Sequence, residues 1–597
     1  MFLRIRKPFQ HKMKNTTSKN RMETIKRIWS YLAVNRKLLY AVLAMVFISS
    51  GLGLLGPYLL GQGIDHFIVT KDYQGILLLL YALVVIYILH SLSLWFQNYW
   101  MVGIAQNTVF SMRTELFSQL HRLPVHFFDK RQHGELMSRV TNDIENVSST
   151  LNSSVIQIFS SLLTLIGTIT IMLWLSPLLT LITLIIIPLM FMGLKWITNR
   201  TGKLFKEQQR HLGELNGFIE ETISGQRIVK TFSQEETVIN EFLKKSAKLK
   251  NAGYLAQAYS GFIPKLMNVL NNASFAIIAG VGGVLALNNA ITIGTIVIFA
   301  EYSRQFTRPL NDLANQFNTL LSAIAGAERV FDILDEELEA KDELEAKAID
   351  TINGDVEYKH VSFSYEKGGN TIKDVSFQVK AGQSVAFVGP TGAGKTTIIN
   401  LLSRFYDPDT GEILIDGMNS TTITRDSLRQ KMGFVLQDSY LFQASIKENI
   451  RYGKLDATDE EVINAAKQAN AHSFIMKLPN QYDTVLKQDG SGISQGQKQL
   501  LSIARAILAN PSILILDEAT SSIDTVTEMR IQEALQRLMQ GRTSFIIAHR
   551  LNTIERADQI IVLNEGEIVE KGTHESLLSE KGNYHNLFYS QFNKQVM

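Results

Sequence analysis

Long apolar segments without charged side chains mark the first half of the chain. Residues 38–64 and 76–100 contain no Asp, Glu, Lys or Arg. Each is longer than the ~20 residues that a helix needs to cross a bilayer. Buried helices of soluble proteins rarely run this far without a charge, so the pattern predicts two membrane spans.

Two further apolar stretches are longer still, and each carries a break near its middle. Residues 155–194 are uncharged but are interrupted at the Ser-Pro pair 176–177, where the proline disfavours helix at the preceding residue. Residues 262–300 contain a single charge and are interrupted at the Asn-Asn pair 288–289. Each stretch predicts a pair of spans, which brings the expected total to six.

The loops between the expected spans alternate in length and in charge. The links after the second and fourth spans are long and rich in charged residues, whereas the other links are short. Basic residues favour the cytoplasmic side, so we expect the long loops and both ends of the chain on the cytoplasmic side of the cell membrane. Breaks in the helical pattern near 127–136 and 220–230 predict short helices at the far ends of the long loops.

The polar pattern divides the chain into four parts. The basic N-terminal segment carries an apolar stripe at helical spacing, which predicts a helix on the membrane surface: Ile25, Ile28, Trp29, Leu32. The expected organisation is therefore a basic tail with this interfacial helix (1–35), an α-helical membrane domain of six spans with long cytoplasmic extensions (36–335), an acidic linker (336–353), and an α/β domain (354–597).

Composition narrows the chemistry. The chain has 597 residues, a formal net charge of +3 and no cysteine. So small a net charge argues against nucleic acid as the main partner. The lack of cysteine excludes disulfides, cysteine catalysis and thiolate metal sites. Candidate catalytic and ligand-binding residues are therefore sought among the polar residues of the second half of the chain.

A phosphate-binding pattern lies at the centre of the α/β domain. G-x-x-x-x-G-K-[ST] is matched by one run of residues: Gly389, Pro390, Thr391, Gly392, Ala393, Gly394, Lys395, Thr396, Thr397. An apolar strand precedes the run and a helix follows it, so a bound phosphate would sit at the N-terminus of that helix. The motif therefore predicts that residues 354–597 form an α/β P-loop nucleotide-binding domain. We expect Lys395 to reach the β- and γ-phosphate oxygens and the Thr396 hydroxyl to ligate Mg²⁺.

Further polar side chains follow the strands of the same domain. We expect Asp517 to hold Mg²⁺ through water and Glu518 to polarise the attacking water as catalytic base. His549 is expected to hydrogen-bond the γ-phosphate, and Gln437 to reach the metal or the water. Tyr365 ends an antiparallel strand and is expected to stack on an adenine ring. Taken singly, a histidine or tyrosine at a strand end is more often structural.

Together these motifs resemble the nucleotide-binding domain of ATP-binding cassette (ABC) transporters. The resemblance rests on the motifs in this order: Tyr365, 389–397, Gln437, Ser494-Gln495-Gly496-Gln497, Asp517-Glu518, Asp524, His549. It implies that Ser494, Gly496, Gln497 and Asp524 contact ATP that is held by a partner domain. It also implies ATP and Mg²⁺ as cofactors, and a second half-transporter subunit, the lipid bilayer and a small amphipathic substrate as partners.

The sequence departs from that family pattern in the residues that would face the ATP of a partner domain. The signature normally reads S-G-G-Q, and here the first glycine is replaced by Gln495; the segment 487–490 also lacks the usual Gly-Glu pair. A side chain at such a position hinders close approach of backbone to phosphate. The resemblance is therefore to the catalytically competent subunit of a bacterial heterodimeric multidrug exporter, whose partner carries a regular signature and a degenerate catalytic site.

The expected function is export of amphipathic drugs or lipids driven by ATP hydrolysis. A homodimeric exporter or lipid flippase is the first alternative, and an ATP-gated channel assembled from the same modules is a second. A soluble cassette ATPase is excluded by the predicted spans.

Overall fold

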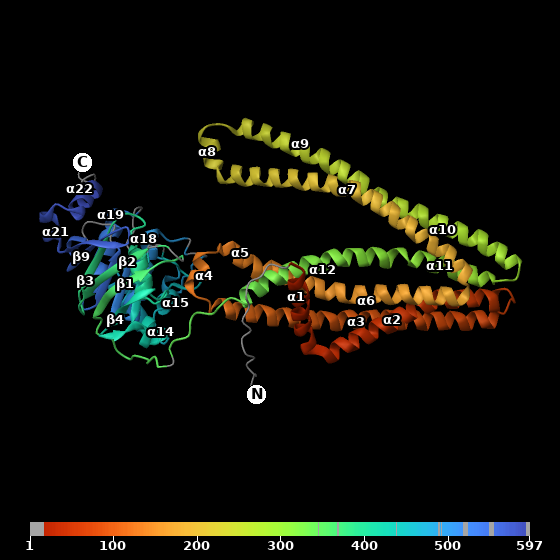
Figure 1. The fold of residues 1–597 in the computed structure, drawn as a ribbon, viewed down its shortest axis with the longest axis horizontal. Helices are drawn as coiled ribbons and strands as arrows, with labels where there is room; N and C mark the ends of the chain where they lie inside the picture. The colour runs from red at the N-terminus through yellow and green to blue at the C-terminus, as the bar shows by residue number, and fades with distance from the viewer. Residues whose placement is uncertain are drawn as a thin grey trace. The chain divides into compact units, whose positions relative to one another are not determined.

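The computed structural model describes residues 17–343, 345–366, 369, 371–436, 439–487, 490, 492–517, 523–547 and 554–592. The chain forms two compact units (Figure 1). The helical unit comprises residues up to Arg122 together with Arg131–Glu336, and the second unit comprises Leu123–Lys130 together with Glu337–Met597. The short segment 123–130 thus belongs with the C-terminal half of the chain.

The first unit consists of helices, several of which are far longer than those of ordinary soluble domains. Its elements are α1 (Thr17–Leu32), α2 (Arg36–Gly63), α3 (Tyr73–Leu120), α5 (His133–Ser138), α6 (Ile144–Leu175), α7 (Pro177–Ser224), α8 (Gln226–Thr231), α9 (Glu235–Ser260), α10 (Phe262–Leu287), α11 (Ile293–Gln305) and α12 (Thr307–Leu334). Short 3₁₀ or π turns join some of them: Ala33–Asn35, Ile64–Ile68, Arg139–Asp143.

The helix breaks fall where the sequence predicts them, and local chemistry explains why. α6 ends at Leu175, and the Ser176 hydroxyl accepts a hydrogen bond from the Leu179 N–H at 3.4 Å. Pro177 begins α7, a position where its missing N–H costs nothing. After α10 the chain turns through Asn289 at φ +56°, and a Thr292 cap starts α11.

The expected six spans are not confirmed by helix length and composition. Among the described residues, four helical segments are long and apolar enough to cross a membrane: Met22–Ile68, Tyr73–Leu120, His133–Leu175, Glu235–Leu287. Of the other two expected spans, one falls on α7, where several side chains lie outside the described part, and the other begins at α11. α11 is 13 residues long, which is too short to cross a bilayer alone.

Polar contacts hold the long helices of this unit together at a few points. The buried Asp143 carboxylate pairs with the Arg329 guanidinium of α12. The Tyr302 hydroxyl, fully buried, donates to the Leu54 carbonyl of α2 at 2.7 Å. Such contacts are favourable because each polar group that leaves water finds a partner.

The second unit contains two β-sheets. A six-stranded sheet has the order β10-β9-β3-β8-β7-β6, in which β9, β3, β8, β7 and β6 run parallel, and an antiparallel four-stranded sheet has the order β2-β1-β4-β5 (Figure 1). The antiparallel arrangement predicted for the strand before Tyr365 is confirmed. The strands are β1 (Val356–Phe363), β2 (Ile372–Val379), β3 (Ser384–Val388), β4 (Thr410–Ile415), β5 (Met418–Asn419), β6 (Met432–Val435), β7 (Ile513–Asp517), β8 (Thr543–Ile547), β9 (Gln559–Asn564) and β10 (Glu567–Gly572).

Helices of this unit follow or cover the strands. Those described are α4 (Val125–Asp129), α13 (Lys395–Leu402), α14 (Arg425–Gln430), α15 (Ile446–Arg451), α16 (Asp459–Gln468), α17 (His472–Ile475), α18 (Gln495–Ala509), α19 (Thr525–Met539), α21 (His574–Glu580) and α22 (Asn583–Phe592), with 3₁₀ turns at Ser420–Thr422 and Gln481–Asp483. The parallel strands are buried along nearly their whole length, as expected for a sheet covered on both faces. Ligands of such sheets bind beyond the carboxyl ends of the strands.

Candidate functional site

The phosphate-binding pattern adopts the strand, loop and helix that the sequence predicts. β3 ends at Val388, the loop follows, and α13 begins at Lys395. Gly394 precedes the helix at φ +99°, and no side chain caps the helix N-terminus. A Cβ at Gly394 would lie 2.6 Å from Ile372 Cδ1, so only glycine fits. The first backbone N–H groups of α13 are therefore left for an external acceptor.

Lys395 lies folded against the loop. Its ammonium group donates to the carbonyls of Gly389 and Pro390 at 2.8 and 2.9 Å, and the residue is 9% exposed. Burial lowers the pKa of Lys395, and the negative charge of Asp517 opposes that shift. An incoming phosphate would offer this partly desolvated cation a stronger acceptor than two neutral carbonyls.

Two hydroxyl side chains of the first helical turn point to different environments. Thr396 is exposed, whereas Thr397 is buried. The Thr397 hydroxyl accepts a hydrogen bond from the Tyr365 hydroxyl at 3.2 Å, and the Asn400 amide donates to the same tyrosine oxygen at 3.2 Å. The Tyr365 hydroxyl is thus hydrogen-bonded to the phosphate-loop helix, while the residue as a whole remains 38% exposed.

The strand pairing brings the carboxyl end of β7 to the loop. Asp517, the last residue of β7, pairs in register with Ile547 of β8, and Ile547 pairs with Phe387 of β3. The effect of the Asp517 charge on the Lys395 pKa agrees with that proximity. Three predicted catalytic residues, Glu518, His549 and Gln437, lie outside the described residues.

The donor set suits a hard cation. The exposed Thr396 hydroxyl and the Asp517 carboxylate are oxygen ligands of the kind that Mg²⁺ prefers when phosphate oxygens and water complete its coordination. Among the described residues, no group of three or more His, Asp or Glu side chains is placed to hold a metal by itself. The residues present thus fit a Mg²⁺ ion that arrives with a nucleotide.

The predicted signature residues form the start of a second helix. The Ser494 hydroxyl accepts from the Gln497 N–H at 3.3 Å, and the Gln497 side chain accepts from the Ser494 N–H at 2.9 Å. These reciprocal bonds form a capping box at the N-terminus of α18. Unlike α13, this helix start is closed by its own side chains.

The two residues after Ser494 differ sharply in what the fold requires. Gly496 is buried, and a Cβ there would lie 2.5 Å from Thr527 Cγ2 and 3.1 Å from Ile523 Cγ2. Gln495 is exposed at the first helical position. The fold therefore demands glycine at 496, while position 495 accepts a side chain freely.

Asp524 has a clear local role. Its carboxylate accepts from the Thr527 N–H at 2.9 Å and caps α19. This hydrogen bond lowers the pKa of Asp524, because an ionised carboxylate is the better acceptor. The cap accounts for an aspartate at this position without any ligand.

Comparison with known proteins identifies the arrangement. The family model described as "ABC transporter transmembrane region" matches residues 39–310, and the model described as "ABC transporter" matches residues 372–521. A Bacillus subtilis protein, the uncharacterized ABC transporter ATP-binding protein YfiC, is 64% identical over 600 residues, which cover 99% of each chain. The chain belongs to the ABC transporter family.

Other relatives of this ABC protein have more informative names. The fatty acid ABC transporter ATP-binding/permease protein of Mycobacterium bovis is 42% identical over 527 residues, covering 88% of this chain and 82% of its own. The ATP-dependent lipid A-core flippase of Syntrophus aciditrophicus is 36% identical over 572 residues, covering 96% and 95%.

Family membership fixes the coarse function of the two units. The chain is an ABC half-transporter of the exporter type, with a helical multi-pass membrane part and a sheet-containing nucleotide-binding domain. It binds ATP and hydrolyses it to drive transport. ABC exporters act as dimers in the lipid bilayer.

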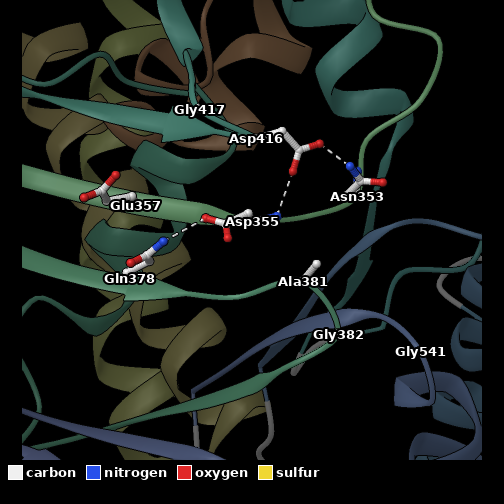
Figure 2. Close-up of a pocket in the computed structure, with 9 residues that line it drawn as sticks. All are labelled: Asn353, Asp355, Glu357, Gln378, Ala381, Gly382, Asp416, Gly417 and Gly541. Carbon is white, nitrogen blue, oxygen red and sulfur yellow. Dashed lines mark hydrogen bonds between the residues drawn. The ribbon is translucent and has the colours of Figure 1, made fainter.

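A cavity of about 800 Å³ in the second unit is unrelated to the phosphate loop of this ABC domain (Figure 2). Its lining includes Ala381 and Gly382, just before β3, and Gly541, just before β8. The cavity therefore lies at the amino ends of the parallel strands, whereas the phosphate loop lies at their carboxyl ends. The Asp416 carboxylate at its rim is already satisfied by the backbone N–H groups of residues 353–355.

The sequence did not reveal two sets of contacts around α13. Tyr406, shortly after the helix, hydrogen-bonds Asp129 of α4 at 2.8 Å. The acidic linker is anchored by arginines that follow α13 or lie on α14, in the pairs Arg404–Asp342, Arg425–Asp342 and Arg429–Glu339. The only sequence signal was the acidity of the linker, because the partners are 62 to 90 residues apart.

Proposed function

We propose that the chain is the catalytically competent subunit of a heterodimeric ABC exporter that moves amphipathic drugs or lipids outward across the cell membrane. One observation carries the proposal: the sequence keeps every residue expected in the site that would hold ATP, whereas the signature offered to a partner carries Gln495, which is exposed. Within one chain, the residues that would hold ATP thus match the family pattern, whereas the signature that would face the partner's ATP departs from it.

The ATP-holding half is supported by the geometry around α13. Lys395, the open helix N-terminus and Tyr365 surround one end of the sheet, and we assign residues 389–397 to the phosphates and Tyr365 to the adenine. We assign Mg²⁺ to Thr396 and Asp517, with Gln437 beside it. Glu518 would act on the attacking water and His549 on the γ-phosphate.

The signature half is where the proposal departs from a symmetric dimer. Ser494, Gly496, Gln497 and Asp524 would face ATP held by the other subunit. The Gln495 side chain stands at the start of α18, where a glycine would let the partner's phosphate approach the backbone closely. Since the fold does not require Gln495, its effect would be confined to the site shared with the partner.

A symmetric dimer would repeat this defect in both sites. An unlike partner with a regular signature would complete the site built on Lys395 and Glu518. The second site would combine the Gln495 signature with a partner site that lacks its catalytic glutamate. The proposed complex therefore hydrolyses ATP mainly at one of its two sites.

The membrane part of the proposal follows the polar pattern. We propose six spans within 36–335, an interfacial helix within 1–35, a linker at 336–353 and a cytoplasmic nucleotide-binding domain at 354–597. Because the chain has no cysteine, single cysteines at Lys71, Asn289 and Gly225 can be probed with an impermeant maleimide. We expect labelling from outside at the first two positions only, and outside labelling at Gly225 would overturn the orientation.

The names of relatives support the substrate class. One is named as a fatty acid transporter and another as a lipid A-core flippase, and both of these molecules are amphipathic. We propose a lipid or a drug of similar character for this chain. Transport assays in vesicles that compare labelled lipids with cationic drugs would decide between them.

The heterodimer is tested by purifying this chain alone and measuring ATP hydrolysis. We expect weak turnover that Gln495→Gly increases, because only a dimer of like chains would be present. Robust, drug-stimulated hydrolysis by the unmodified chain would overturn the heterodimer and favour the homodimeric exporter or flippase. In the complete transporter, Glu518→Gln should nearly abolish turnover while ATP still binds. Single-channel currents gated by ATP would instead identify a channel.

A further inference from the structure

A second cavity of the nucleotide-binding domain is lined by the end of α16 and the start of α17 on one side and by α19 on the other. Its volume is about 480 Å³, which lies within the range of small-molecule sites. None of the residues that line it belongs to the phosphate loop or to the other positions assigned to ATP. The cavity therefore needs an explanation of its own.

Hydrogen bonds tie the two sides of this cavity together. Asn470, at φ +57° between α16 and α17, donates through its amide to the Arg530 carbonyl at 2.9 Å and to the Glu533 carboxylate at 3.1 Å. Arg537 donates to the Asn470 amide oxygen at 2.9 Å and lies 3.4 Å from a carboxylate oxygen of Glu533. The cavity is thus formed without a ligand, and the charge of Glu533, the one acidic residue among the described lining residues, is offset by Arg537.

The remaining charge of the lining is positive. Lys467 and Arg530 are exposed, and in the part of the chain that the structure describes neither of them forms an ion pair. His472 Nδ1 is hydrogen-bonded to the Tyr482 hydroxyl at 2.9 Å, so its other ring nitrogen and the Ser473 hydroxyl are further polar groups of the lining. Cationic groups are the strongest partners of carboxylates and phosphates. The polar part of the cavity therefore suits an anion.

Two side chains of α19 add an apolar surface to the same lining. Val526 and Met529 are 56% and 57% exposed. They stand three residues apart, so they lie on one face of the helix. Covering them with an apolar group would remove their surface from water, which is favourable. A ligand with a charged head and a small apolar group fits this lining better than a bare inorganic ion does.

The cavity is connected to the signature residues through α19. Hydrogen bonds from Thr527 lower the pKa of Asp524, and the positive charge of Arg530 acts in the same direction. Thr527 is also the residue whose methyl group leaves no room for a side chain at Gly496. A ligand that binds Arg530 would therefore change the charge near Asp524 and contact the helix on which α18 packs.

We propose that this cavity is a regulatory site for a small amphipathic anion, which carries a carboxylate or a phosphate beside a short apolar group. The anionic head contacts Lys467 and Arg530, and the apolar group covers Val526 and Met529. The bound ligand offsets the charge of Arg530 and changes the rate of ATP hydrolysis. The regulatory effect rests on the proposed role of the signature, whereas binding to the cavity does not.

Binding is tested on the purified full chain, whose lack of cysteine allows a single one to be placed in the cavity. Ser473→Cys is labelled with N-ethylmaleimide, a neutral reagent, with and without phenyl phosphate or phenylacetate. We expect labelling to slow about threefold once a probe reaches twice its Kd, and protection by one probe alone would identify the head group. Ser579→Cys, at an exposed serine of α21, is the matched control and should show no protection.

Two results would overturn the site as proposed. Absence of protection by both probes would show that the cavity binds no such anion. Inorganic phosphate should need a concentration at least about fivefold higher than phenyl phosphate, because it covers no apolar surface. Equal protection by the two would show that the apolar residues take no part.

Charge variants in the Ser473→Cys background locate the bound probe. Lys467→Gln combined with Arg530→Gln should raise the Kd of either probe about 10- to 100-fold, as for a lost charge-assisted contact. Lys477→Gln, at an exposed lysine outside the lining, should leave the Kd unchanged, and an equal rise there would reduce the effect to general charge. Lys395→Ala should also leave it unchanged. Protection that is lost in Lys395→Ala would place the probe at the phosphate loop and overturn the cavity.

The regulatory role is read from ATP turnover of the complete transporter. A saturating probe should change kcat by about twofold or more in the parent and should have no effect when Lys467 and Arg530 are both replaced by Gln. If the probe protects Ser473→Cys but leaves kcat unchanged, the cavity remains a binding site and its regulatory role is overturned. Absence of turnover even without a probe would instead count against the proposed function.

Discussion

The nucleotide-binding domain contains two helix N-termini that differ in how their first backbone N–H groups are satisfied. α13 starts at Lys395 behind a glycine with no side-chain cap, and the lysine ammonium group donates to the carbonyls of Gly389 and Pro390. α18 starts behind Ser494 with a complete capping box. The first start is incomplete without a ligand, whereas the second is satisfied as it stands.

This difference follows from where each ligand comes from. A helix start with free N–H groups and a nearby cation attracts a phosphate by itself. A helix start that is closed by its own Ser and Gln has no such need, so under the proposed function its contact with ATP would depend on how closely a second subunit brings its nucleotide. We infer that the defect at Gln495 is silent in the isolated chain's fold and is expressed only across the dimer.

Removing the lysine should have the largest effect on the first helix start. Lys395→Ala deletes a charge-assisted contact worth ~1.5–3 kcal/mol, so we expect ATP affinity to fall roughly 10- to 100-fold. The measurement is equilibrium binding of a fluorescent ATP analogue to the transporter. Ser494→Ala is the matched control at the second start, and an equal loss of affinity in both variants would contradict the contrast between them.

Adding a methyl group at the second start should destabilise the domain. Gly496→Ala would place a Cβ 2.5 Å from Thr527 Cγ2, and forcing α18 and α19 apart costs ~1–3 kcal/mol. Thermal unfolding should show a lower Tm, while Gln495→Ala at the exposed neighbour stays within ~0.5 kcal/mol of the parent. Equal stability of the two variants would remove the structural distinction between these positions.

Opening the capping box should have a smaller effect. Ser494→Ala removes the acceptor for the Gln497 N–H, which costs ~1 kcal/mol of stability. For a domain of this size that corresponds to about 2–4 °C in Tm. ATP turnover of the complete transporter should change little if this signature serves the slower site, and a loss comparable to that of Lys395→Ala would argue for two equivalent sites.

The smallest expected effect is one of pH. The proposed contact of Lys395 with ATP needs a charged ammonium group, and burial lowers the pKa of this lysine. The affinity for ATP should therefore have its full value at neutral pH. As the pH rises, it should fall before the range in which an ordinary lysine titrates. Isothermal titration across alkaline pH would show this decline, and Lys395→Arg should flatten it, because a guanidinium stays charged. A decline that persists in Lys395→Arg would point to another group.

Local sequence signals predicted much of this architecture. The strand, glycine loop and helix around Lys395 appear as expected, because a tight turn between a buried strand and a helix is set by residues adjacent in the chain. The helix break at Ser176-Pro177 is local for the same reason. The predictions for Glu518, His549 and Gln437 remain predictions, since they fall outside the described residues.

Contacts between distant residues could not be predicted in the same way. The hydrogen bond between Tyr406 and Asp129 joins residues 277 positions apart. Neither residue stands out in its local stretch of sequence. The reason that Gly496 must be glycine lies in Thr527 on another helix. Such requirements arise from packing, which periodicity does not encode.

The anchored linker sets the length of any useful soluble fragment. Arg404 and Arg425 are 3% and 8% exposed, and Asp342 neutralises part of their charge. A fragment that starts at residue 354 would keep Asp407 but lose Asp342 and Glu339, leaving buried guanidinium groups short of counter-charge. A fragment that starts at Glu337 retains both acids and should express and crystallise as the better-behaved protein.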